Sequence, residues 1–194
     1  MNIIQIGCNS GKDTHSKLIE ESESAVLIDV NPSCIEQAKE RYKDFDHVSF
    51  EAVAVIPIDI KEVEINLFQE EDVQDSNWTS TNPDFVAAHC HHSNLKSFKS
   101  KTTTLSSLLR KYPETDNLII DTEGLDFLNI LSIDNELFDQ LKMLTFEFIH
   151  SDGITQSGRK LDCLCFFLHH LGFTIEQDKD CKYNLVCKKS LPKQ

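Results

Sequence analysis

Residues 3–11 have the sequence Ile3-Ile4-Gln5-Ile6-Gly7-Cys8-Asn9-Ser10-Gly11. A short β-branched run that ends in a glycine-containing segment predicts a buried strand followed by a tight turn. The following residues predict a helix over about 14–21. A strand, a glycine loop and a helix in this order are typical of the first unit of a parallel α/β sheet.

The same alternation continues along most of the chain. Short apolar runs predict strands at about 25–28, 48–53, 117–121, 143–149, 173–176 and 183–187. Helical patterns lie between them, at about 32–42, 104–111, 126–141 and 157–171. Because parallel strands need crossover connections, alternating strands and helices predict a doubly wound, mainly parallel sheet with helices on both faces.

The middle of the chain breaks this pattern. Residues 56–68 alternate in part between apolar and polar side chains, which predicts an edge hairpin. Residues 69–101 are polar and without periodicity, and we interpret them as a long loop inserted into the domain. A length of 194 residues suits one domain, so we expect a single domain over residues 1–194.

Composition limits the partners and the compartment. The chain has 19 Lys and Arg against 32 Asp and Glu, a net charge of −13, which disfavours nucleic acid and anionic membranes as partners. No apolar run approaches the ~20 residues that span a bilayer. The N-terminus has no secretory signal, and the seven cysteines are scattered, so we expect a cytoplasmic protein with reduced thiols.

Candidate ligand-binding residues gather where the first three strands end. In an open parallel sheet the ligand binds beyond the carboxyl ends of the strands. The segments that reach this edge are the Gly7–Gly11 loop, the segment from Asp29 to Asn31 and the end of the third strand. A carboxylate at the end of the second strand is placed to accept both hydroxyls of a ribose.

Three ligands compete for this geometry. A dinucleotide site requires the G-x-G-x-x-G fingerprint, but Asn9 replaces its second glycine. A P-loop requires four residues between its first glycine and Gly-Lys, followed by Ser or Thr. Here only three residues separate Gly7 from Gly11-Lys12, and Asp13 follows. A nucleoside without phosphates, such as S-adenosylmethionine, needs only a close loop and a ribose-binding carboxylate, and it fits best.

Several motifs resemble those of the FkbM-type S-adenosylmethionine-dependent methyltransferases. The family's opening hydrophobic-x-G-x-N-x-G is similar to residues 6–11, and its Glu-Pro-Asn-Pro is similar to Asp29-Val30-Asn31-Pro32. Its signature strand I-D-V-E-G resembles Ile120-Asp121-Thr122-Glu123-Gly124. The likeness extends over most of residues 3–187. It implies a seven-stranded Rossmann-like sheet, the class I methyltransferase fold.

The resemblance also implies an activity and a set of contacts. It implies S-adenosylmethionine-dependent methyl transfer, most often to a hydroxyl of a small molecule or glycan. The residues expected to bind the cofactor are Gly7, Cys8, Asn9, Gly11, Asp29, Val30, Ala52 and Val53. The chain departs from the family at Gln5, where class I methyltransferases often have an acid, and at Ser106, where the family commonly has Asp.

Asp121, Glu123 and His150 are the candidate catalytic residues. The two acids follow a buried strand, so we expect them at the ligand edge of the sheet, although acids also favour a helix start. His150 ends the fifth predicted strand, where an imidazole is suited to deprotonate an acceptor hydroxyl, but a solvated histidine is equally ordinary there. Residues 89–92, His-Cys-His-His, lack the spacing of a zinc site, and we expect no metal.

Two other classes of function remain open. A methyltransferase fold that has lost catalysis would serve as a binding module, and the departures at Gln5 and Ser106 are compatible with this. A nicotinamide-dependent oxidoreductase uses a similar sheet, but the chain lacks the complete glycine fingerprint and a Tyr-x-x-x-Lys pair.

Overall fold

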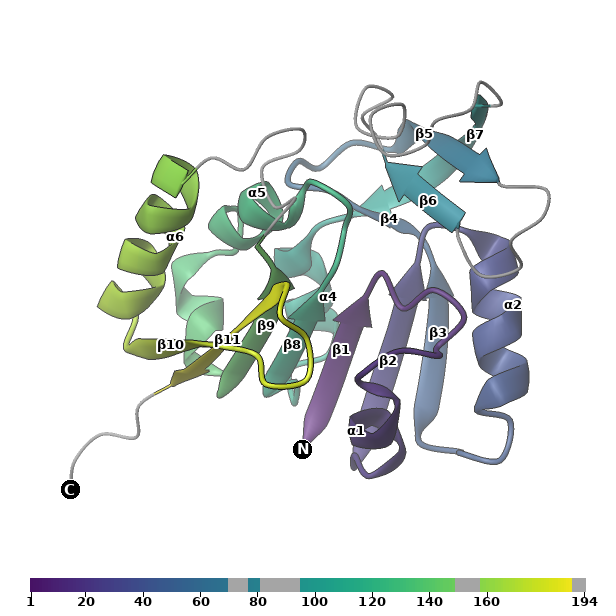
Figure 1. Cartoon of the computed structure of the whole chain (residues 1–194). Helices are drawn as coiled ribbons and strands as arrows, with labels where there is room; N and C mark the ends of the chain where they lie inside the picture. Colours follow the sequence, from purple (N-terminus) through teal and green to yellow (C-terminus); the bar gives the residue numbers. More distant parts are fainter. Residues whose placement is uncertain (70–76, 81–94, 149–157, 190–194) are drawn as a thin grey trace.

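The structure is a computed structural model that describes residues 1–69, 77–80, 95–148 and 158–189. Seven strands form the central sheet (Figure 1). They are β1 (Asn2–Ile6), β2 (Ser24–Asp29), β3 (Val48–Ala52), β8 (Asn117–Ile120), β9 (Met143–Glu147), β10 (Phe173–Gln177) and β11 (Asn184–Lys189). Their order across the sheet is β10-β11-β9-β8-β1-β2-β3.

The strand directions confirm the expected fold. Neighbours from β3 to β9 are all parallel, and β11 is antiparallel to both β9 and β10. The chain leaves β1 toward β3 and later returns to β8 on the other side of β1, so the order reverses between β1 and β8. This doubly wound, mainly parallel seven-stranded sheet is the class I methyltransferase fold. Its switch point is where such a sheet binds ligands.

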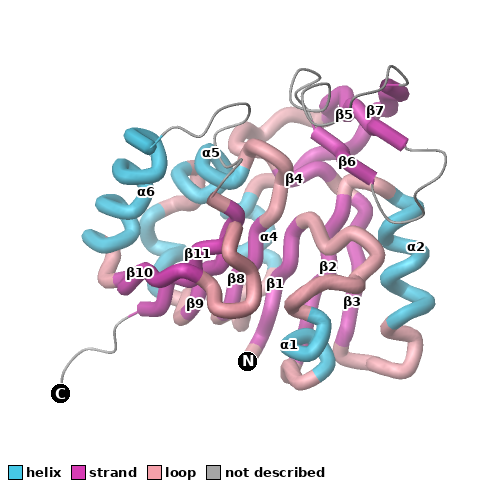
Figure 2. Tube along the Cα trace, in the orientation of Figure 1, coloured by secondary structure: helices cyan, strands magenta, loops and turns pink. Residues whose placement is uncertain are grey.

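Helices cover both faces of the sheet (Figure 2). They are α1 (Ser16–Glu20), α2 (Pro32–Arg41), α4 (Leu105–Lys111), α5 (Asp126–Leu131), the 3-10 helix η1 (Asn135–Asp139) and α6 (Gly158–His170). Leu27 packs with Ile19 and Ile35 of α1 and α2, whereas the next residue, Ile28, shares a core with Leu105 of α4. None of the described helices is long and apolar enough to cross a membrane.

The helix expected over residues 126–141 is two helices, α5 and η1. Ser132 is the C-cap residue of α5, and its hydroxyl donates to the carbonyl oxygen of Asn129 at 2.7 Å. The backbone N–H of Asp134 then donates to the hydroxyl of Ser106 at 2.9 Å, which ties the turn to α4. Ser106, one of the departures from the family pattern, therefore holds this turn in place.

A second sheet replaces the expected hairpin and part of the expected loop. Its strands are β4 (Ala54–Val55), β5 (Glu62–Gln69), β6 (Asn77–Ser80) and β7 (Leu95–Thr103), in the order β4-β7-β5-β6. β5 is one strand that pairs on one side with β6, at residues 8 to 14 positions away. On its other side it pairs with β7 at residues 27 to 39 positions away, as in the pair Ile65 and Phe98, and no local turn signal marks that pairing. The described residues of the 69–101 stretch, which are 69, 77–80 and 95–101, are therefore all in strands. Residues 70–76 and 81–94, with the His-Cys-His-His segment, lie outside the described residues.

The second sheet lies at the carboxyl end of the central sheet (Figure 1). Ala54, Ile56 and Ile65 form a small buried cluster there. Val30, which follows β2, and Leu125, which precedes α5, pack against this cluster. The second sheet therefore covers the edge at which parallel strands present their ligand-binding residues.

Candidate functional site

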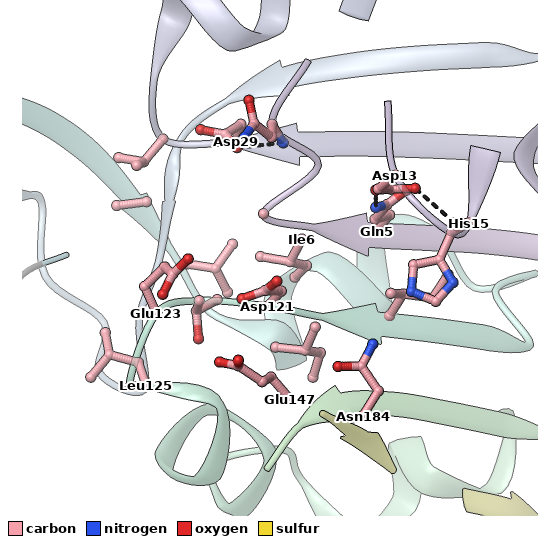
Figure 3. Close-up of a pocket in the computed structure, with 18 of the residues that line it drawn as sticks. Gln5, Ile6, Asp13, His15, Asp29, Asp121, Glu123, Leu125, Glu147 and Asn184 are labelled. Carbon is pink, nitrogen blue, oxygen red and sulfur yellow. Dashed lines mark hydrogen bonds between the residues drawn. The ribbon is translucent and has the colours of Figure 1, made fainter. Parts of the chain in front are cut away.

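A cavity of about 390 Å³ opens at the carboxyl ends of β1, β2, β8 and β9 (Figure 3). Its volume falls in the range of small-molecule sites. The central sheet supplies the acids Asp29, Asp121 and Glu147, and the second sheet supplies Ile65. The cavity thus lies at the switch point, between the two sheets.

The loop after β1 depends on glycine at two positions. Gly7 has φ +73°, and a Cβ there would lie 1.8 Å from the backbone oxygen of Asp121. Gly11 has φ +72°, and a Cβ would lie 2.7 Å from the ring of Tyr42. The Tyr42 hydroxyl also donates to the carbonyl oxygen of Gly11 at 2.9 Å. The glycines therefore let the loop lie directly on β8 and α2, which a side chain would prevent.

Asp29 holds the loop and still faces the cavity. The backbone N–H of Asn9 donates to Oδ2 of Asp29 at 2.9 Å, and the N–H of Asn31 donates to Oδ1 at 2.8 Å. Each carboxylate oxygen has a second lone pair, so both can accept another hydrogen bond. Burial raises the pKa of Asp29 to about 6, although the bonds from Asn31 and Asn9 favour its charged form.

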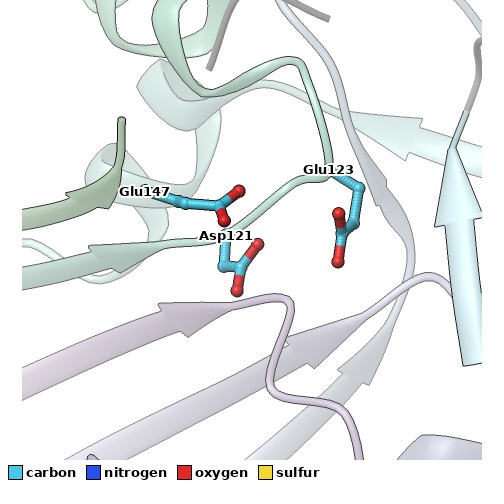
Figure 4. A group of neighbouring side chains, drawn as sticks. All are labelled: Asp121, Glu123 and Glu147. Carbon is cyan, nitrogen blue, oxygen red and sulfur yellow. The ribbon is translucent and has the colours of Figure 1, made fainter. Parts of the chain in front are cut away.

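Three carboxylates meet at the cavity: Asp121, Glu123 and Glu147 (Figure 4). One oxygen of each lies within 4.8 Å of the others. Asp121 follows β8, Glu147 ends β9, and Glu123 has φ +49° in the turn that leads to α5. Carboxylate oxygens are ligands for hard divalent cations, but an acidic cluster alone does not define a metal site.

Burial and neighbouring negative charges raise the pKa of Asp121 and Glu123. Burial, followed by the charges of Asp126 and Glu147, raises the pKa of Asp121 well above its usual range. Burial and then the charge of Asp121 do the same for Glu123. Burial also raises the pKa of Asp126 to about 7, although its Oδ1 accepts the N–H of Thr122 at 3.0 Å. At neutral pH the cavity therefore favours a cation or a proton.

We expect the ligand-free protein to become more stable as the pH is lowered from about 8 to about 5.5. The folded-state pKa values of Asp29 and Asp126 are about 6 and about 7, above the ordinary 3.8. The folded protein therefore holds protons that the unfolded chain releases. This contribution is full below pH ~4 and is lost as the pH rises through about 6 and 7. Thermal unfolding across this range measures it.

Asp126→Asn is the control for this pH dependence. In the wild type, Oδ2 of Asp126 and Oδ1 of Asn129 are buried without a hydrogen-bond partner. Asparagine cannot ionise, so we expect a higher Tm at pH ~8 and a flatter profile. A profile as steep as that of the wild type would contradict the assignment to Asp126.

The structure brings together most of the residues predicted from the sequence. Seven of the predicted residues line the cavity: Gly7, Asn9, Asp29, Val30, Val53, Asp121 and Glu123. Cys8 does not line the cavity, because its side chain is fully buried in the core with α1 and α2. Gly11 does not line the cavity either and packs against Tyr42 instead. Ala52 pairs with Asp29 and is exposed, but only its neighbour Val53 lines the cavity. His150 lies outside the described residues.

The lining also includes residues that were not predicted from the sequence, among them Gln5, Asp13, Ile65, Leu125 and Glu147. Glu147 ends a parallel strand, so the rule that selected Asp29 could have found it. Ile65 belongs to β5 of the second sheet, and Leu125 packs against the cluster that contains Ile65. No local sequence pattern predicts either contact. Asp13 depends on the path of the loop after Gly11.

No protein-family model matches the chain, and no curated protein matches it with significant similarity. Some solved structures resemble it. The N-methyltransferase NodS from Bradyrhizobium japonicum WM9 is 15% identical, with 97% of this chain and 86% of that chain covered and a TM-score of 0.46. Precorrin-6y C5,15-methyltransferase from Geobacter metallireducens GS-15 is 12% identical, with 98% and 80% covered and a TM-score of 0.49. Similarity at this level assigns no activity or substrate to this chain.

Proposed function

We propose that the chain is an S-adenosylmethionine-dependent methyltransferase. The observation that carries this proposal is the position of Asp29. Its carboxylate ends β2, faces the cavity and is held by the N–H groups of Asn9 and Asn31. A ribose diol beneath the glycine loop would donate one hydrogen bond to each oxygen.

The charge of the cavity supports the same ligand. Five carboxylates line it, from Asp13, Asp29, Asp121, Glu123 and Glu147, against the cationic or basic side chains of Lys12 and His15. S-adenosylmethionine carries a sulfonium and an ammonium group, which this field attracts. The pyrophosphate of a dinucleotide would be repelled. The cavity thus favours the adenosyl ligand over NAD.

Each part of the cavity would have a distinct task. The bound cofactor supplies a methyl group on a positively charged sulfur, which an acceptor attacks in line. Asp29 would fix the ribose, Val30 and Leu125 would cover the purine, and the glycine loop would bring the backbone close. Holding two reactants in line can supply ~7–11 kcal/mol of the acceleration.

For the acceptor we propose a hydroxyl of a small molecule or glycan, as the resemblance to the FkbM-type family implies. Such an acceptor must lose a proton. Asp121 and Glu123 line the cavity, and burial raises the pKa of each, which makes each carboxylate a stronger base than an exposed one. Glu147 joins them as a third candidate.

Binding measurements test this proposal. We expect thermal unfolding and titration calorimetry to show binding of S-adenosylmethionine and S-adenosylhomocysteine but not of NAD. Ligand at 100 times its dissociation constant adds ~2.7 kcal/mol, or roughly 5–11 °C for a chain of this size. Binding of NAD alone would favour an oxidoreductase. Binding of none of the three would favour a non-catalytic binding module.

Affinity for S-adenosylhomocysteine should fall as the pH is lowered through about 6. The pKa of Asp29 is raised to about 6, and only its charged form accepts hydrogen bonds at both oxygens. Protonation therefore removes one acceptor for the ribose. Calorimetry at about pH 7.5 and about pH 5 measures the change. An affinity that does not change, or that rises in acid, would contradict ribose binding by Asp29.

A further inference from the structure

A polar group lies at one end of the cavity, away from Asp29. Gln5 of β1 is buried, with 3% of its surface exposed, and its side-chain N–H donates to Oδ2 of Asp13. The backbone N–H of His15 donates to Oδ1 of Asp13 at 2.8 Å. All three residues line the cavity, and Figure 3 shows them together on the side opposite Glu123.

The loop that carries Asp13 is fixed by its own hydrogen bonds. The backbone N–H of Asp13 donates to the Ser16 hydroxyl at 3.1 Å. That hydroxyl lies 3.0 Å from the carbonyl oxygen of Gly11, to which it is placed to donate. Asp13 is therefore positioned before any ligand binds, which lowers the entropic cost of binding.

The charge of Asp13 has no cationic partner within the described residues. Its side chain accepts hydrogen bonds from the amide of Gln5 and the N–H of His15, both of which are neutral donors. Asp121 faces the same space, and the charge of Asp13 is one of the causes that raise the pKa of Asp121. A cation between the two carboxylates would relieve their repulsion.

We propose that Asp13 binds the ammonium group of the amino-acid part of S-adenosylmethionine, with Gln5 as the residue that positions it. This inference rests on the proposed function. Gln5 precedes Gly7 by two positions, which places it roughly 7 Å along β1 from the glycine loop. An adenosyl group at Asp29 would thus extend its aminoacyl chain past Asp121 toward Asp13. Asp13, in the loop after β1, would thus supply the carboxylate that class I methyltransferases often have at the position of Gln5.

Two ligands separate this role from a general effect on the site. S-adenosylhomocysteine contains the ammonium group, whereas 5′-methylthioadenosine has the same thioadenosine without the amino acid. We expect Asp13→Asn to weaken S-adenosylhomocysteine on the order of 10- to 100-fold, because a charge-assisted hydrogen bond is lost. The affinity for 5′-methylthioadenosine should stay within about twofold.

Asp44→Asn is the matched control, because it removes the same charge from an exposed position that does not line the cavity. Both affinities should be unchanged in it. Equal weakening of the two ligands in Asp13→Asn would overturn the proposal, because it would indicate a displaced loop. An unchanged affinity for S-adenosylhomocysteine would overturn it as well. If wild type binds neither ligand, the proposed function itself fails.

Discussion

Gly7→Ala is expected to lower Tm by roughly 5–20 °C. The new Cβ would lie 1.8 Å from the backbone oxygen of Asp121, so β1 and β8 would have to separate at the switch point. The left-handed conformation, φ +73°, costs a non-glycine residue about 1–2 kcal/mol, and overpacking typically adds ~1–3 kcal/mol. Calorimetry measures the change directly.

Gly172→Ala separates the two causes of this destabilisation. Gly172 also has a positive φ, +87°, but a Cβ there would meet no atom within 4 Å. Only the conformational cost of ~1–2 kcal/mol applies, so Tm should fall by a few degrees. Equal decreases in the two variants would mean that the contact with Asp121 is not the cause.

The central sheet could be predicted because its strands carry their own signal. In β2 and β8, consecutive residues such as Leu27 and Ile28 are both buried, because helices cover both faces. This gives an uninterrupted apolar run in the sequence. The helix starts were equally local, as in the bond from the N–H of Ser33 to the side chain of Asn31 at 3.0 Å.

The second sheet could not be predicted in the same way. β5 and β7 pair over residues that lie 27 to 39 positions apart, with Glu62 opposite Lys101 and Ile65 opposite Phe98. In β7, one face carries the exposed polar side chains of Ser97, Lys99 and Lys101, so the apolar signal is about half as dense as in the central sheet. Residues between the strands add length without a pattern. A stretch that pairs at long range therefore resembles a loop.

The candidate site likewise contains residues that the local sequence predicts and residues that only tertiary contacts bring there. Asp29, Asp121 and Glu123 were predicted because parallel strands bring their carboxyl ends to one edge. The place of Asp13 in the candidate site depends instead on its hydrogen bond from the side chain of Gln5. In the sequence, Gln5 indicated only that the acid common at this position was absent. Cys8 shows the opposite case, because its place in the loop suggested a contact with the cofactor, whereas the structure places its side chain in the core.

Asp29→Ala is expected to weaken S-adenosylhomocysteine on the order of 100-fold or more. Two hydrogen bonds from the ribose to a charged group are lost, each worth ~1.5–3 kcal/mol. The N–H groups of Asn9 and Asn31 also lose their acceptor, which loosens the glycine loop. Titration calorimetry at about pH 8, where Asp29 is charged in the wild type, measures the loss.

Asp116→Ala is the matched control for this variant. Asp116 also accepts a backbone N–H, from Asn2 at 2.9 Å, and an ammonium group, from Lys142 at 2.8 Å, but it does not line the cavity. Its removal should lower Tm and leave the affinity unchanged. If Asp29→Ala bound S-adenosylhomocysteine as well as Asp116→Ala does, the ribose would have to be bound elsewhere. The position of Asp29, which carries the proposed function, would then no longer support it.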